Sequence, residues 1–414
     1  MISFERFTLD NGLKVIIHTD KSMPIVAFNI LYNVGAKHED PNRTGFAHLF
    51  EHLMFGGSIN IPNYDEPVEQ AGGENNAFTS NDITNYYLTL PKENIETAFW
   101  LESDRMLNLA FSQKSLDVQK NVVIEEFNQR YLNQPYGDVW LHLRPLAYKV
   151  HPYQWPTIGK TPEHIASATL TEVKNFFYSH YAPNNAILCV AGDISASKVL
   201  TMAKKWFGPI PSRELGLKSI EKEPQQNEFR SLELTRNVPY NSIYKAYHMC
   251  SKNHNDFAAT DLLSDILSNG KSSRLFQNLV KQKNIFSNID AFITGDNDEG
   301  LFIINGRLND DYSFEKAEAA IEQELEIIKT SSITEYELEK VKNKFESSFT
   351  LGLTSANEIA LNLCQYELLG DAHMLNSVVS TYRQVAIADI EKVANAIFTR
   401  NNCSTLYYKS EKIK

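Results

Sequence analysis

Alternation of apolar and polar positions predicts that the chain begins with β-strands. Short alternating runs at 7–9 and 13–18 flank an Asp-Asn-Gly sequence at 10–12, which is typical of a tight hairpin turn. A continuous apolar run at 25–34 predicts a buried strand, and residues within 77–90 alternate with the period of a strand.

Helical periodicity follows these strands. Apolar residues recur every three or four positions over 93–110, 115–132 and 170–178, which is the spacing of one helical face. Pro135 ends the second of these regions, because proline cannot continue a helix. A further apolar run at 186–192 predicts another buried strand.

A shorter helix is predicted between the strand at 25–34 and the alternating segment. Thr44 is its expected N-cap, and Gly56 with Gly57 is its expected C-terminal stop. Its interior carries the bulky apolar residues Phe46, Leu49, Phe50, Leu53, Met54 and Phe55. Since little polar surface remains, we expect this helix to be buried.

The order of predicted elements restarts in the second half of the chain. A strand, a helix, a strand pair and a helix pair match those of the first half, at 243–249, 257–268, 286–295, 300–307, 317–330 and 335–349, respectively. Self-similarity of this kind indicates an internal duplication that covers about half the chain in each copy.

A polar segment separates the two copies. Residues 211–231 are mostly polar and charged and contain two prolines, as linkers often do. We therefore expect a first domain at 1–215, a linker at 216–231 and a second domain at 232–414. The expected fold class is α+β, with two homologous α/β domains, each an antiparallel β-sheet with helices packed on one face.

Composition is that of a globular protein, with 414 residues, 43% hydrophobic and 22% charged. The net charge of −11 argues against general nucleic-acid binding, and no apolar run has the length of a membrane span. The cysteines (Cys189, Cys250, Cys364 and Cys403) are far apart and form no C-x-x-C pair. Reduced thiols and the lack of a signal-like N-terminus favour a cytoplasmic location.

The short buried helix carries the sequence H-x-x-E-H, at His48, Glu51 and His52. Their spacing places both imidazoles on one helical face with the carboxylate beside them. Two imidazoles and a third protein ligand leave a fourth zinc position for water, as in catalytic zinc sites. Zinc lowers the pKa of that water, and Glu51 can accept its proton. The reversed order relative to H-E-x-x-H is typical of inverted zincins.

A chance match on a solvated helix face is the alternative interpretation of this motif. The apolar surroundings favour a metal, because buried imidazoles and carboxylates need a polar partner. The second copy has Asp261, Ser264 and Asp265 at the three motif positions, so we expect one zinc ion per chain, held by the first half.

The third ligand is expected on the helix at 115–132, where Glu125 and Glu126 are adjacent. Glu126 shares a helical face with Val122 and Val123, whereas Glu125 lies nearer to polar residues. The more buried carboxylate is the better ligand, which favours Glu126. A solvated surface glutamate is the alternative, and the residue pattern alone leaves the choice open.

Five longer stretches resemble the pitrilysin/insulinase metallopeptidases, and within them the short, bacterial-type branch similar to mitochondrial processing peptidase. The resemblance extends over essentially the whole chain. It is carried by GFAHLFEHLMFGGS at 45–58, GGENNAFTSNDITNYY at 72–87, VVIEEF at 122–127, HPYQWPTIG at 151–159 and SSRLFQNL at 272–279.

The resemblance implies roles for individual residues. The family's zinc ligands map onto His48, His52 and Glu126, and its catalytic base maps onto Glu51. Family members commonly carry an acidic residue two turns before the ligand glutamate. Here that place is taken by Gln119, for which the resemblance implies a supporting role in orienting Glu126 through a hydrogen bond.

The resemblance also implies how substrate is held. Asn76, Ala77 and Phe78 are expected to form an exposed strand edge near the zinc, which pairs with an extended peptide by β-augmentation. Backbone hydrogen bonds would accept many peptide sequences. An ordinary covered edge strand is the alternative.

One departure from the family concerns an Arg and a Tyr that active members usually carry seven residues apart in the second half. Val280 and Ser287 stand at these places. We therefore expect a zinc metalloendopeptidase that is the catalytic subunit of a heterodimer, with a homologous partner that supplies Arg and Tyr in trans. Peptides or unfolded polypeptides are the expected substrates, with no nucleic-acid or membrane partner. The alternative is a non-catalytic scaffold or regulatory subunit, against which the complete ligand set argues.

Overall fold

The computed structural model describes residues 1–216, 219–330 and 333–411, and packing divides the chain into two units. Unit 1 comprises 1–129, 155–220 and 350–377, and unit 2 comprises 130–154, 221–349 and 378–414. Two residues of the expected linker, 217 and 218, lie outside the described residues. The units are discontinuous in sequence, and the domain limits expected from the sequence stay a prediction.

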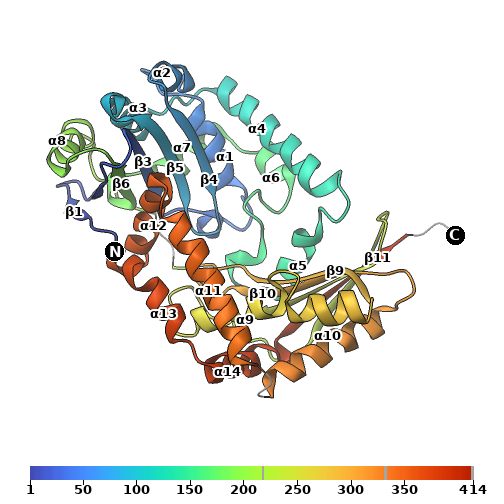
Figure 1. Cartoon of the computed structure of the whole chain (residues 1–414). Coiled ribbons are helices and arrows are strands. Elements are labelled where there is room, and N and C mark those ends of the chain that lie inside the picture. Colours follow the sequence, from blue (N-terminus) through green and yellow to red (C-terminus); the bar gives the residue numbers. More distant parts are fainter. Residues whose placement is uncertain (217–218, 331–332, 412–414) are drawn as a thin grey trace. The chain divides into compact units, whose positions relative to one another are not determined.

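Unit 1 is built on a six-stranded sheet in the order β1-β2-β6-β3-β5-β4 (Figure 1). Its strands are β1 (Glu5–Thr8), β2 (Lys14–Thr19), β3 (Ile25–Tyr32), β4 (Glu74–Thr79), β5 (Thr84–Pro91) and β6 (Ala186–Gly192). Its helices are α1 (Phe46–Phe55), α2 (Asp65–Gln70), α3 (Glu96–Asn108), α4 (Gln113–Phe127), α6 (Pro162–Ala166), α7 (Leu170–His180), α8 (Ala196–Trp206) and α12 (Ala356–Leu368).

Unit 2 is built on a five-stranded sheet in the order β7-β11-β8-β10-β9. Its strands are β7 (Arg230–Arg236), β8 (Ser242–His248), β9 (Phe286–Ile293), β10 (Leu301–Leu308) and β11 (Cys403–Ser410). Its helices are α5 (Val139–Ala147), α9 (Phe257–Ser268), α10 (Phe314–Lys329), α11 (Glu335–Gly352, in unit 2 up to residue 349), α13 (Val378–Gln384) and α14 (Ile387–Ile397).

The two sheets repeat one topology. Without β1, the unit 1 sheet runs β2-β6-β3-β5-β4, and its first pair is parallel while the others are antiparallel. The unit 2 sheet has the same sequence of directions, with β7 and β11 as its parallel pair. The predicted α+β class is confirmed, and each sheet is antiparallel except at this one pair.

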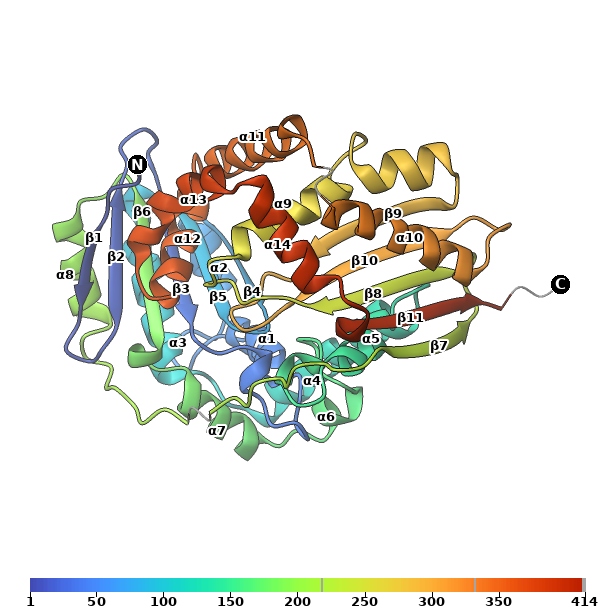
Figure 2. The same cartoon turned by 90° about the horizontal axis from the view of Figure 1, so that it is seen from below.

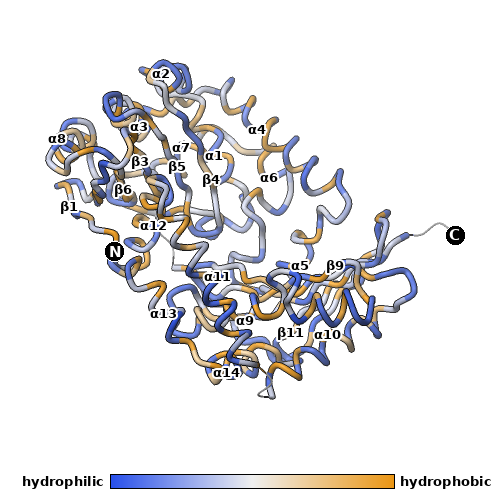
Figure 3. The backbone as a smooth tube through the Cα atoms, in the orientation of Figure 1, coloured by the Kyte–Doolittle hydropathy of each residue, from blue (hydrophilic) through white to orange (hydrophobic). Residues whose placement is uncertain are grey.

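Each unit also takes a helix from the other half of the sequence. Helix α12, from the second half, packs on β3 and β6 of unit 1, and α5, from the first half, packs on β11 and β8 of unit 2 (Figure 2). Along α4 and α10, hydrophilic and hydrophobic residues alternate, as expected for helices with one packed face (Figure 3).

Helices cover both faces of the unit 1 sheet, where the sequence predicted one covered face. Phe28 on β3 packs against Phe99 of α3. Its neighbour Asn29 points the opposite way, as successive strand residues do, and lies opposite Cys189 of β6. The Cys189 thiol interacts with Cys364 of α12. The two covered faces explain why the apolar run of β3 is continuous rather than alternating.

Two of the cysteines that are far apart in sequence are therefore neighbours in space. Burial raises the pKa of the Cys189 thiol well above its ordinary value, with a contribution from Cys364. All four cysteines are free thiols. Among the described residues, no helix is long and apolar enough to cross a membrane.

Candidate metal centre

Helix α1, which carries the H-x-x-E-H motif, begins one residue later than the sequence predicts. Gly45 is its N-cap, at a φ of +91°, and a Cβ there would lie 2.6 Å from the carbonyl oxygen of Ile158. Thr44, the expected N-cap, instead lies with its hydroxyl 2.8 Å from Nδ1 of His164 and accepts a hydrogen bond from the backbone of Lys160. The close approach and the positive φ explain why glycine occupies the cap.

The carboxylate of Glu39 serves this helix end in place of a local cap. Its two oxygens accept hydrogen bonds from the backbone N–H groups of Gly45 (2.9 Å) and Ala47 (2.8 Å). The indole of Trp155 donates to it at 3.2 Å. Burial raises the pKa of Glu39 to about 8, while these donors act in the opposite direction. A carboxylate here satisfies N–H groups that the helix itself leaves without acceptors.

The other end of α1 meets a buried cation. Arg105 forms a two-pronged ion pair with Glu102, at 2.7 and 2.6 Å, and its guanidinium donates to the backbone oxygen of Met54 at 3.5 Å. The guanidinium also lies over the rings of Tyr64 and Tyr86. A carboxyl group that accepts hydrogen bonds at the first turn and a cation at the last both complement the polarity of the helix ends, so buried polar groups hold both ends of α1.

Aromatic packing sets the rotation of the helix about its axis. Phe50 stacks with Phe176, Phe177 and Tyr181, at centroid distances of 5.1, 6.2 and 5.2 Å. Because Phe50 lies two residues from each motif histidine, its side chain occupies the opposite side of the helix. Burial of Phe50 therefore turns both imidazoles away from this aromatic cluster.

The two imidazoles converge on one carboxylate of α4. Nε2 of His48 and Nε2 of His52 lie 3.7 and 3.3 Å from the same oxygen of Glu126. The rings are 4.8 Å apart and nearly perpendicular, at 85°. Ligand atoms that share one tetrahedral zinc are separated by about 3.3 Å, so two nitrogens and one oxygen at these distances fit the ion. His48 is buried while His52 and Glu126 are partly exposed, which leaves an accessible side for water.

The structure also places the other residues expected around the metal. Glu125 is exposed and Glu126 is partly buried, in agreement with the burial argument. Val123 is buried as assumed, but Val122 is 43% exposed, so that part of the argument is wrong. Gln119 is partly buried on α4. About 10 Å of helix rise separates it from Glu126, a long span for a direct hydrogen bond, and its role stays a prediction.

The expected base, Glu51, is hydrogen-bonded to the strand that was expected to bind substrate. The hydroxyl of Thr79, the last residue of β4, donates to a carboxylate oxygen of Glu51 at 2.7 Å. Sequence reasoning missed Thr79, although it directly follows the segment Asn76–Phe78. Strand β4 is at the border of its sheet and pairs with β5. Asn76 is exposed, and its side-chain oxygen accepts a hydrogen bond from the backbone N–H of Ala77 at 2.8 Å.

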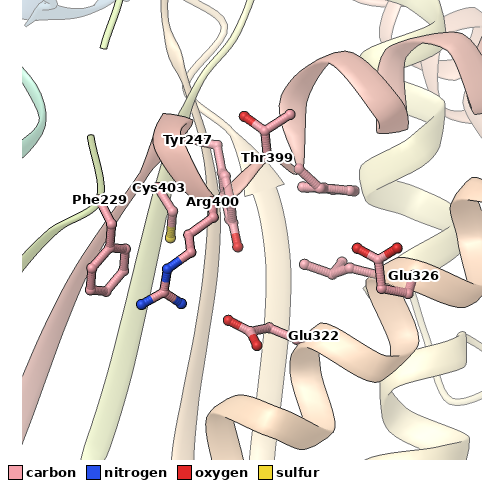
Figure 4. A pocket seen from close by; sticks show the side chains of 9 residues that line it. Phe229, Tyr247, Glu322, Glu326, Thr399, Arg400 and Cys403 are labelled. Atoms are coloured by element: carbon pink, nitrogen blue, oxygen red, sulfur yellow. The ribbon is translucent and has the colours of Figure 1, made fainter. Parts of the chain in front are cut away.

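Unit 2 contains a pocket of its own, shown in Figure 4. It has a buried floor that includes Tyr247 and Cys403, and a charged rim. On the rim, the guanidinium of Arg400 lies over the ring of Phe229 at 4.7 Å, and Glu322 lies 3.5 Å from the ammonium group of Lys245. Among the described residues, the group that could hold a metal ion is that of His48, His52 and Glu126 in unit 1.

Known proteins match the chain along nearly its whole length. A sequence profile described as insulinase (peptidase family M16) matches residues 14–160, and one described as the peptidase M16 inactive domain matches 167–345. A Helicobacter pylori protein named zinc protease PqqE is 30% identical, over 98% of this chain and 92% of that protein. A crystal structure of a protease from Helicobacter pylori matches with a TM-score of 0.94 at 30% identity, over 99% of this chain and 100% of that chain.

A eukaryotic relative matches as well. A protein of Arabidopsis thaliana named probable mitochondrial-processing peptidase subunit beta is 24% identical, over 85% of this chain and 68% of that protein. The first profile contains every residue of the candidate metal centre, whereas the profile described as inactive begins after them.

Proposed function

The chain belongs to the insulinase (peptidase M16) family, and from this premise we propose that it is a zinc metalloendopeptidase that cleaves peptides held in an extended conformation. The observation that carries the proposal is the convergence of His48, His52 and Glu126 on one point, with Glu51 on the same helix. These residues would hold one zinc ion per chain. Such a donor set with an exposed side is that of a catalytic zinc site rather than a structural one.

The mechanism assigns proton transfer to Glu51. Zinc, when bound, supplies a Lewis acid that polarises the scissile carbonyl and lowers the pKa of a coordinated water. Glu51 takes the proton of the attacking water and delivers it to the leaving nitrogen of the cleaved bond. Because Glu51 adjoins His52 in the same helix, its carboxylate would lie beside a metal held by these ligands.

Strand β4 is the proposed binding edge for substrate. As the border strand it offers one row of backbone groups that β5 does not use, and an extended peptide pairs with such an edge. Asn76, Ala77 and Phe78 would make this contact. The hydrogen bond from the Ala77 N–H to the Asn76 side chain is one that a peptide carbonyl would replace.

We also propose that the chain acts as the catalytic subunit of a heterodimer. Ser287 is exposed on β9 and Val280 is partly buried, and neither supplies the Arg or Tyr that active relatives carry. Arg274, which lies nearby in sequence, is held by Glu337 in a two-pronged ion pair at 2.8 and 2.9 Å. One relative is itself named as a subunit. A homologous partner would supply the missing pair.

A scaffold or regulatory role has less support. The match described as inactive spans residues 167–345, whereas the part of the chain before it keeps two imidazoles, a carboxylate ligand and a base.

The test combines metal analysis with a fluorogenic peptide assay. The purified chain is expected to bind one zinc ion, and Glu51→Gln to keep the zinc but lose turnover, because the amide cannot accept the proton. The chain alone is expected to turn over slowly, and a homologous partner to restore full activity. Full turnover by the chain alone would contradict the heterodimer, and a chain that binds no zinc at these side chains would contradict the peptidase assignment.

A further inference from the structure

We infer that Thr79 is a positioning residue that orients the carboxylate of Glu51 for proton transfer. This inference rests on the proposed function and deepens it. The Thr79 hydroxyl donates to Glu51 at 2.7 Å and so connects the border strand β4 to the metal-binding helix α1. A glutamate side chain has several rotatable single bonds, and a hydrogen bond to one of its carboxylate oxygens restricts rotation about them.

The direction of the Thr79 hydroxyl is set by its strand. Threonine is branched at Cβ and has few accessible side-chain conformations. Its backbone is paired in register with β5, where it lies opposite Thr84. Thr84 is fully buried, and its own hydroxyl donates to the backbone oxygen of Val34 at 2.9 Å. The two threonines share one face of the hairpin, but only Thr79 contacts the base.

The turn that follows Thr79 is anchored to the segment before α1. The backbone N–H groups of Ala36 and Lys37 donate to the backbone oxygens of Ser80 and Asn81, at 3.1 and 2.9 Å. The Lys37 ammonium group pairs with Asp82 at 2.7 Å, and both side chains are largely buried. These contacts hold the hairpin end against the chain that leads into α1, so the distance between Thr79 and Glu51 does not depend on a mobile loop.

A consequence follows for the reaction. Residues 76–78, proposed to hold the peptide, directly precede Thr79 on the same strand. One strand would therefore bind the substrate backbone and orient the group that activates the attacking water. Such an arrangement keeps base and peptide bond in register, which is the kind of alignment that accelerates a reaction.

The test uses a fluorogenic peptide that the wild-type assembly cleaves. Thr79→Val keeps the shape of the side chain and removes the hydroxyl. Residues that orient a catalytic group typically contribute about 10- to 100-fold, so we expect kcat to fall by about that factor while KM and zinc content stay near the wild-type values. Thr79→Ser, which keeps the donor, is expected to restore most of the loss.

Thr84→Val is the matched control, because it removes a buried hydroxyl at the opposite position without touching Glu51. Its kcat is expected to stay close to wild type even if its thermal stability falls. In a Glu51→Gln background, Thr79→Val is expected to cause no further loss, since the two residues act through one contact. Should Thr79→Val fail to fold, Thr79→Ala and Thr79→Ser give the same comparison, as they differ by the hydroxyl.

Several outcomes would overturn the inference. They are an unchanged kcat in Thr79→Val, a rise in KM alone, loss of zinc, or an equal loss of kcat in Thr84→Val. These outcomes are distinct from failure of the proposed function, which would appear as a wild-type chain that binds no zinc at His48, His52 and Glu126. An inactive Glu51→Gln together with a fully active Thr79→Val would reject the role of Thr79 and leave the peptidase assignment intact.

Discussion

Helices α1 and α9 occupy corresponding places in the two repeated units, yet their side chains meet different partners. On α1, His48 and His52 face the carboxylate of Glu126. On α9, Asp261 accepts a hydrogen bond from the hydroxyl of Tyr382 at 2.7 Å, and Asp265 accepts one from the side chain of Asn269 at 2.6 Å. The two aspartates of the second copy are thus hydrogen-bonded to other side chains, whereas the first copy brings two imidazole nitrogens and one carboxylate oxygen, all possible metal ligands, close together.

The two helices also differ in the groups that contact their ends, which are buried at α1 and solvent-accessible at the start of α9. The first turn of α1 is served by the buried carboxylate of Glu39 and its last turn by the buried Arg105. The N-cap of α9 is Asp256, whose carboxylate pairs with the exposed ammonium group of Lys392. Burying charges is costly unless every one is paired. At the N-cap of α9 the acidic group is thus paired at the surface, whereas Glu39 and Arg105 at the two ends of α1 are buried.

The largest effect is expected at the metal itself, where two adjacent residues of α4 provide the comparison. Glu126→Gln removes the charged ligand and is expected to lower zinc affinity by more than the 10- to 100-fold typical of residues that merely support ligands. Glu125→Gln is its matched control, because Glu125 is exposed, and should bind zinc as wild type does. Competition with a chromogenic chelator measures both. Equal affinities would show that Glu126 is not a ligand.

The next effect concerns the helix ends and separates α1 from α9. Glu39→Ala leaves the N–H groups of Gly45 and Ala47 and the indole of Trp155 without their acceptor in a buried place, which is expected to lower the free energy of unfolding by about 2 to 4 kcal/mol. Asp256→Ala, at the N-cap of α9, removes a solvent-accessible ion pair and should cost less than about 1 kcal/mol. Urea unfolding followed by circular dichroism compares them. Similar losses would mean that the buried carboxylate has no special importance for α1.

Much of this architecture could be predicted from the sequence because its signals are local. Strand period and helix period located the core strands, α1, α3 and α4, and the repeated order indicated two related units. The hairpin of β4 and β5 was harder to delimit. Residues 74–76 are polar although they belong to β4, since a border strand has one unpaired side, and the turn signals at Ser80 and Asn81 lie inside the alternating segment.

What the sequence could not indicate depends on contacts between distant segments. The packing of α12 in unit 1 joins residues more than 150 positions apart. The helical periodicity of α12 shows that it has an apolar face, but it does not indicate which strands that face packs against. Within the site, the helical spacing of His48 and His52 was sufficient to pair them, and burial favoured Glu126. Glu39 and Thr79 were missed for the same reason as α12, because a single hydrogen bond across the fold leaves no repeating pattern in the chain.

The smallest expected effect is a pH dependence in the second copy. Burial raises the pKa of Asp261 to about 6, and Tyr382 acts in the opposite direction. An acid whose pKa is higher in the folded state binds more protons there than in the unfolded chain, so its contribution to stability declines as the pH rises from about 4 to about 6. Asp261→Asn removes this titration and leaves an oxygen that can accept from Tyr382. The variant is therefore expected to resemble wild type at pH 4 and to be more stable by about 1 to 2 kcal/mol at pH 7. Urea unfolding at both pH values measures the difference. A variant that is destabilised equally at both pH values would mean that the titration of Asp261 does not affect stability, and that its hydrogen bond with Tyr382 matters more than its burial.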